Sequence, residues 1–335
     1  MYKLTVTLCS LAVLTATAAF AQTNPAFEVA TIKPAPPMDQ ARVLAAMQAG
    51  GKMPYGANID SARAEYLYMD LRSLLSYAYG VKPYQITGPD WMSTTRFDIV
   101  AKMPAGSKKG DAPKMLQTLL EERFKLTVHR TTAEHPVLAL VAGKGGPKLK
   151  ASADKPVAID ESAPLKPGEL KMDGPDGPTR IKVDVTTGSS VIDMGLKGKM
   201  SYRLVPATRT FHIDFSMTTM AGFADMITQL FQQLGGTGGR QVVDMTGITG
   251  NYDASIELSL AELIAVARAA GADIPAGGPG GAGGQGNNPA VASDPGAGGS
   301  SLADAVQSMG LKLESRKAVV EQLIVDHLEK TPTEN

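Results

Sequence analysis

The chain has 335 residues, with 33 lysines and arginines against 33 aspartates and glutamates, and a single cysteine, Cys9. The charge is balanced and the sequence contains no basic stripe. Because binding to phosphates requires such a stripe, we expect no nucleic-acid partner. One cysteine cannot form an intramolecular disulfide, so we expect a packed core to hold the fold together.

The first 21 residues have the three parts of a Sec-type signal peptide. Lys3 supplies the positive charge, residues 4–20 are apolar or small, and Ala19 and Ala21 frame a small-x-small cleavage site. No later apolar run reaches the roughly 20 residues that a spanning helix needs. We therefore expect a mature chain that begins at Gln22, is periplasmic or secreted, and has no stable membrane insertion.

Four later segments carry apolar residues at helical spacing. They are Leu71–Tyr79, Leu116–Phe124, Phe223–Leu234 and Leu302–Met309. Short β-type runs separate these segments. The predicted strands are Phe27–Ile32, Gln85–Thr87, Arg96–Ala101, Lys125–Arg130, Val137–Val141, Thr210–Phe215, Gln241–Asp244, Tyr252–Leu258, Lys312–Ser315 and Glu321–His327.

These elements come in the same order twice. Each half has a helix, two short strands, a linker, a second helix and a closing hairpin, and Phe97-Asp98-Ile99 corresponds to Tyr252-Asp253-Ala254. The order predicts an internal duplication and an α+β fold. We expect two related helix–strand–strand repeats, with the helices packed on a mainly antiparallel or mixed sheet.

Composition divides the mature chain into parts. Residues 22–150 are predicted to form the first α+β repeat and residues 206–335 the second, with a Pro-rich connecting segment over 151–205. Within the second repeat, residues 271–300 are dominated by glycine. Such a stretch has few side chains to bury, so we expect a disordered loop.

Two histidines flank a predicted hairpin turn at residues 130–134. If the turn forms, His129 and His135 face each other across two strands, and Glu134 lies beside them. Imidazole and carboxylate are ordinary zinc and copper ligands, but a real site needs three or four. The three residues therefore remain weak metal candidates; no metal or other cofactor is predicted.

The single tryptophan, Trp91, follows a turn and lies near Tyr79 and Tyr84 in the sequence. Aromatic residues with a polar group favour interfaces, so these three predict a candidate binding surface. The alternative, a place at the edge of the core, is the commoner one for a lone tryptophan.

Familiar catalytic motifs do not fit. Asp244-Met245-Thr246-Gly247 departs from an Asp-Thr-Gly protease loop by its inserted methionine, and a tight turn explains its glycine. The glycines after Leu234 follow a helix, whereas a phosphate loop precedes one. The sequence also contains no Gly-x-Ser-x-Gly and no His-Glu-x-x-His motif.

Four segments together resemble a known family. They are Phe27–Pro34, Leu119–Leu126 with His129 close behind, Val243–Asp253 and Leu311–Asn335. The resemblance is to exported soil-bacterial proteins of unknown function, present in many paralogous copies per genome. Similar domains are attached to sensor-type membrane metallopeptidases. The resemblance implies a compartment outside the cytoplasm and supplies no catalytic residue.

Three functional hypotheses follow. The first is a non-enzymatic binding or interaction module of the cell envelope, with an envelope protein or a small ligand as its partner. The second is a hydrolase with an unfamiliar site near His129, using Glu134 or Asp98. The third is the sensing component of an envelope signalling system. The absence of a familiar catalytic motif favours the first.

Overall fold

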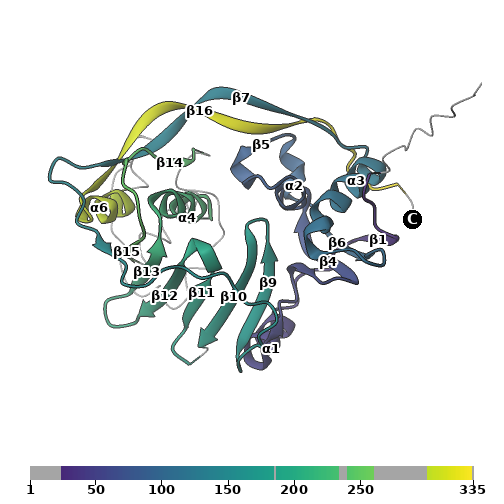
Figure 1. Cartoon of the computed structure of the whole chain (residues 1–335), viewed down its shortest axis with the longest axis horizontal. Helices are drawn as coiled ribbons and strands as arrows, with labels where there is room; N and C mark the ends of the chain where they lie inside the picture. Colours follow the sequence, from purple (N-terminus) through teal and green to yellow (C-terminus); the bar gives the residue numbers. More distant parts are fainter. Residues whose placement is uncertain (1–23, 185, 234–239, 260–299, 334–335) are drawn as a thin grey trace, which may run out of the picture.

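A computed structural model describes residues 24–184, 186–233, 240–259 and 300–333. The predicted signal peptide and residues 271–299 of the Gly-rich loop lie outside these ranges. The described part has three layers: a large curved sheet, a layer of helices, and a long ribbon that arches over them (Figure 1). The helices are α1 (Gln40–Ala49), α2 (Leu71–Tyr79), α3 (Ala112–Phe124), α4 (Met220–Gln233) and α6 (Ser300–Ser308).

The large sheet has 12 strands among the described residues and is antiparallel except where β2 joins β9. In spatial order its strands are β1 (Val29–Pro34), β6 (Arg96–Lys102), β4 (Arg63–Asp70), β3 (Gly56–Ile59), β9 (Glu169–Gly174), β10 (Gly177–Asp184), β11 (Ser189–Asp193), β12 (Lys199–Val205), β13 (Thr210–Thr218), β15 (Tyr252–Ser259) and β8 (Lys150–Ala151), with β2 (Gly51–Lys52) beside β9.

The second sheet has four strands in the described chain. They are β14 (Val242–Asp244), β7 (Thr127–Ala142), β16 (Leu311–His327) and β5 (Ile86–Thr87), in that spatial order. The two long strands pair antiparallel along their whole length, from Thr127 opposite His327 to Ala142 opposite Leu311. The short strands β14 and β5 lie parallel to β7 and β16 respectively. The ribbon in Figure 1 is therefore mostly two strands wide.

The predicted fold class is wrong. The structure is mostly β, with 43% strand and 24% helix among the residues described, and its large sheet is not a surface for helix-packed α+β repeats. One reason is the Pro-rich segment 151–205, which contributes β9, β10, β11 and β12 to the middle of that sheet. The other is that both predicted closing hairpins are single continuous strands, β7 and β16.

Two hydrophobic clusters fill the space between the sheets. The first surrounds Leu74, Leu116 and Phe124, and the second surrounds Phe223 and Ile256. The ribbon contributes to both clusters, because its two ends lie over different helices. The β7 and β16 residues buried in the clusters are Leu323 in the first and Leu140 and Leu311 in the second.

The four predicted amphipathic helices are confirmed as α2, α3, α4 and α6. Local signals explain their ends. The Asp70 side chain accepts the Ser73 backbone N–H at 2.8 Å and caps α2, and Gly80, with φ 64°, ends it in the left-handed conformation. The Thr219 hydroxyl accepts the Gly222 N–H at 3.1 Å at the start of α4.

The strand that precedes α2 and the strand that precedes α4 each contain a β-bulge, and an aspartate side chain holds each bulge. Tyr68 in β4 and Met217 in β13 have φ of 54° and 57°, in the left-handed region that non-glycine residues rarely adopt. The Tyr68 N–H donates to Asp98 at 2.8 Å, and the Met217 N–H donates to Asp253 at 3.1 Å. Each aspartate thus satisfies an amide that the bulge removes from the strand ladder.

We expect Asp98→Ala to lower the free energy of unfolding by about 1 kcal/mol, because the half-buried Tyr68 amide loses its acceptor. Asp98→Asn keeps a side-chain oxygen at the same place and should cost less. Urea denaturation with an unchanged m-value measures both. Equal losses in the two variants would show that this hydrogen bond does not hold the bulge.

Candidate functional site

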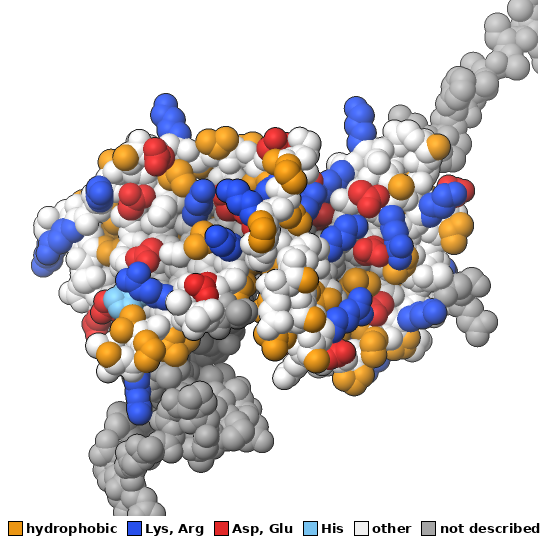
Figure 2. All heavy atoms as spheres, turned by 90° about the horizontal axis from the view of Figure 1, so that it is seen from below, with side chains coloured by type: hydrophobic (Ala, Val, Ile, Leu, Met, Phe, Trp, Pro, Cys, Tyr) orange, Lys and Arg blue, Asp and Glu red, His pale blue; other side chains and the backbone are white. Residues whose placement is uncertain are grey.

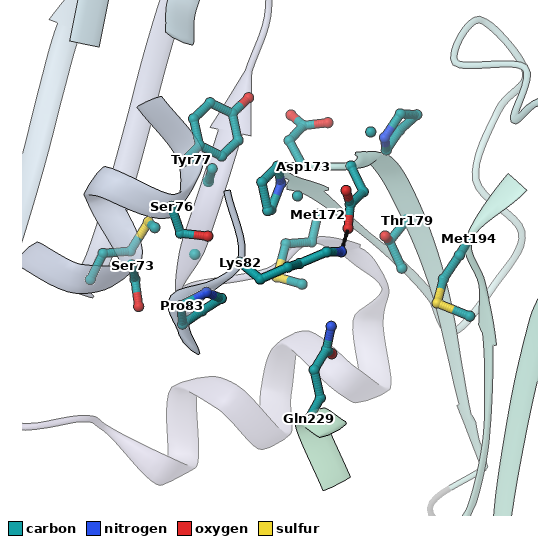
Figure 3. A pocket seen from close by; sticks show the side chains of 18 of the residues that line it. Ser73, Ser76, Tyr77, Lys82, Pro83, Met172, Asp173, Thr179, Met194 and Gln229 are labelled. Atoms are coloured by element: carbon teal, nitrogen blue, oxygen red, sulfur yellow. Dashed lines mark hydrogen bonds and ion pairs between the residues drawn. The ribbon is translucent and has the colours of Figure 1, made fainter. Parts of the chain in front are cut away.

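A cavity of about 560 Å³ lies between the two hydrophobic clusters, beside the part of the large sheet that runs from one cluster to the other. Helix α2, the short 3₁₀ helix Pro83–Gln85, the β9–β10 hairpin and the end of β11 supply its walls (Figure 3). Most lining side chains are apolar or small. The apolar ones are Ala57, Met69, Tyr77, Pro83, Met172, Pro175, Pro178 and Met194.

An ion-paired cluster forms the polar wall of the cavity. Lys82 binds Asp176 at the tip of the β9–β10 hairpin, and its Nζ lies 3.5 Å from Asp225 of α4. Lys197, just after β11, approaches the other Asp176 oxygen at 2.7 Å. The Tyr84 hydroxyl donates to Asp225 at 3.0 Å. These contacts join the two halves of the molecule across the cavity.

Burial and charge act against each other in this cluster. Burial alone lowers the pKa of Lys82, but Asp176 and Asp225 outweigh it, so the pKa of the ammonium is raised. Burial likewise raises the pKa of Asp176, and Lys197 and Lys82 reverse that effect, so the pKa of this carboxyl is lowered. Burial, with Asp225 and then Asp176, raises the pKa of Tyr84. Lys82 and Asp176 therefore both stay ionised at neutral pH.

A second acidic group borders the cavity but is already occupied. Asp173 has a side chain only 3% exposed; it binds Lys109 and accepts the Ile59 N–H at 2.7 Å. Lys109 also binds Glu161, which in turn contacts Lys171 at 3.0 Å. The Asp173 carboxylate therefore has structural partners already, and a ligand in the cavity would have to displace them to bind it.

The structure separates the predicted metal candidates. No hairpin turn exists at residues 130–134, because β7 continues through it, so His129 and His135 lie six positions apart on one strand, about 20 Å. His129 contacts Asp326 of β16 at 2.8 Å, and Glu134 pairs with Val319 in the ladder. In the part of the chain that the structure describes, no group of three or more His, Cys, Asp or Glu side chains could hold a metal ion.

Two of the three aromatic candidates pack against the first hydrophobic cluster, and the third lies beside the cavity. Trp91 packs against the first hydrophobic cluster, with the Lys330 ammonium 5.5 Å from its ring centroid. Tyr79 packs against the same cluster, and burial, together with Glu121, raises its pKa to about 12. Tyr84 instead reaches Asp225 beside the cavity. A binding surface that includes Trp91 and Tyr79 stays a prediction.

Lysines, arginines and acids are intermixed on the face seen in Figure 2, where no large patch of one sign appears. Among the described residues, no helix is both long and apolar enough to cross a membrane.

The cavity residues escaped sequence analysis because they come from distant positions. Lys82 precedes the 3₁₀ helix at Pro83, Asp176 lies in the β9–β10 turn, Lys197 follows β11, and Asp225 comes from α4. The one local signal was the Pro175-Asp176-Gly177 sequence, which is typical of a turn.

A family described as a protein of unknown function, DUF3738, matches residues 72–328. The chain belongs to this family. The DUF3738 match begins in α2, ends just after β16, and includes the whole Lys82–Asp176–Asp225–Lys197 cluster. A search of the curated proteins gave no match, and neither did a search of the solved structures.

In this DUF3738 protein, acid should weaken the wild type more than Asp176→Asn. A carboxyl whose folded pKa is lowered stabilises the fold above its unfolded pKa, 3.8 for Asp176, and loses that contribution as the pH falls through the folded pKa. As the pH falls from about 5 through the unfolded pKa and then the lower folded pKa, the stability advantage of the wild type should therefore shrink. Urea denaturation across this range measures the difference, and parallel curves would contradict the expectation.

Proposed function

We propose that the protein is a non-enzymatic binding module of the cell envelope that takes a small amphipathic ligand into the central cavity. The observation that carries this proposal is the cavity itself. Its volume of about 560 Å³ lies within the range of roughly 300–1,000 Å³ that is usual for small-molecule sites. Such sites combine an apolar lining with a few placed polar groups, and this one does the same.

The chemistry of the lining supports binding over catalysis. No histidine is among the described residues that line the cavity, and its carboxylates Asp173 and Asp176 are ion-paired. The Ser76 hydroxyl donates to the Val81 carbonyl at 2.6 Å, so no base activates it. A nucleophile needs an adjacent base that is itself oriented by a third group. The hydrolase hypothesis near His129 gains no support either, because that side chain lies on the exposed ribbon.

The envelope part of the proposal rests on the first 21 residues, whose charge, apolar run and cleavage site are those of a secretory signal.

Export can be tested by the size of the mature chain. Expressed with a C-terminal tag in a Gram-negative host, the protein should be recovered from the periplasm or medium with Gln22 as its first residue. Replacing Ala19 and Ala21 with arginine should leave the precursor uncleaved. Intact-mass spectrometry reads both results, and a cytoplasmic protein that begins at Met1 would contradict the proposal.

Ligand binding can be tested by filling the cavity. Thr179 of β10 lines it, whereas the exposed Lys182 lies on the opposite face of the same strand. The neutral fluorescent probe N-phenylnaphthylamine should bind the wild type with a micromolar Kd, as should Lys182→Trp. Thr179→Trp should bind at least about tenfold more weakly, because the indole occupies the apolar space.

Equal binding by the two tryptophan variants would place the probe elsewhere on the protein and contradict the proposal. Thermal unfolding of each variant without the probe shows whether the substitution has disturbed the fold.

A further inference from the structure

We infer that the ligand carries an anionic head group that takes the place of the Asp176 carboxylate between Lys82 and Lys197. The inference rests on the proposed function and names the class of ligand: a carboxylate-headed amphiphile of the fatty-acid type.

Two ammonium groups from separate elements meet at one point of the cavity wall. Lys82 precedes the 3₁₀ helix at Pro83, and Lys197 follows β11, yet both contact the same carboxylate. The Lys82 side chain is only 15% exposed. Like charges brought together in a partly dry place need an anion between them. In the structure Asp176 is that anion.

The residue that fills this position lies in an exposed turn, from which an incoming anion can displace its side chain. Asp176 lies at the two-residue tip of the β9–β10 hairpin, between the paired residues Gly174 and Gly177, and its side chain is 38% exposed. A rotation of the side chain is enough to return the carboxylate to water. An incoming carboxylate would then restore the charge balance of the two lysines, with the same hydrogen-bond geometry.

The surroundings of the lysines fit the rest of an amphiphile. Met172, Met194 and Pro83 line the cavity together with Lys82 (Figure 3), on the side that β9, the end of β11 and the 3₁₀ helix supply. Methionine is flexible and polarisable, so it adapts to alkyl chains of different shape. An apolar chain would lie along these side chains while its head group remains at the two ammonium groups.

A cationic head group fits less well. It would need an acid with free acceptor capacity, but Asp173 is held by Lys109 and the Ile59 amide. Asp225 contacts Lys82 and accepts the Tyr84 hydroxyl. Both acids would have to break existing contacts, whereas the lysines need only exchange one carboxylate for another.

Calorimetric titration of the mature chain with decanoate, decanol and decylamine tests the inference, because these probes share one chain and differ in the head group. Decanoate should bind most tightly. Asp176→Asn should strengthen decanoate binding by about tenfold and leave decanol unchanged, since the competing carboxylate is gone.

The matched lysine variants are Lys197→Gln and Lys199→Gln. Lys197→Gln should weaken decanoate binding by about tenfold. Lys199 is close in sequence and similarly exposed, but pairs with Asp193 away from Asp176, so Lys199→Gln should change nothing. Both lysines are surface-accessible, and thermal unfolding confirms that each variant is folded.

The outcomes separate the two proposals. Binding of all three probes with equal affinity, or a preference for decylamine, overturns the anionic head group and leaves the binding module standing. If Asp176→Asn weakens decanoate binding, that result also overturns the proposed exchange of the Asp176 carboxylate for the ligand carboxylate. Failure of every probe to bind overturns the proposed function, and the inference with it.

Discussion

The pairing of β7 with β16 is the interaction on which the rest of the structure depends. Each strand begins over one hydrophobic cluster and ends over the other, so the ladder of backbone hydrogen bonds couples two cores that are otherwise linked through the large sheet and the contacts of Asp225. In the middle of the ribbon this ladder has little apolar support: Val319 is 69% exposed. Pro136 lies there as well, without an N–H to offer a further strand. Helices α2 and α4 consequently lie between the large sheet and the β7–β16 ribbon. Between the two halves of the molecule remains the cavity, which neither cluster fills.

That space is where the charged cluster lies, and its position explains its chemistry. Lys82 comes from the first half and Asp225 from the second, while Asp176 lies in the β9–β10 turn and Lys197 just after β11, in the segment that connects the two halves. Ion pairs at this depth contribute modestly to stability, because desolvation offsets much of the Coulomb attraction. They are better suited to setting the spacing of the two halves around the cavity and to favouring one kind of ligand over another.

The sequence was informative wherever burial imposes a period. Leu71, Leu74 and Leu75 lie on one face of α2, and the same periodicity located α3, α4 and α6. It failed where burial is absent or comes from distant parts of the chain. The middle of β7 is exposed, so it shows no alternation, and its polar residues suggest a turn. The strands β9 to β12 lie among prolines and glycines that are typical of a linker, and only their neighbours in the sheet hold them extended. The cavity had no sequence signature because its charged residues come from four separate segments of the chain.

The long ribbon also bears on the order of folding. His129 and Asp326, which touch across it, are 197 positions apart, and β16 is synthesised after every other strand described. Contacts of such high sequence separation form slowly, because the chain must close a large loop before they contribute any stability. Until β16 docks, both cores lack one of their walls. A chain leaving the ribosome would therefore stay open for most of its synthesis, and the proposed export would need that open state, because a translocation pore passes only unfolded chain.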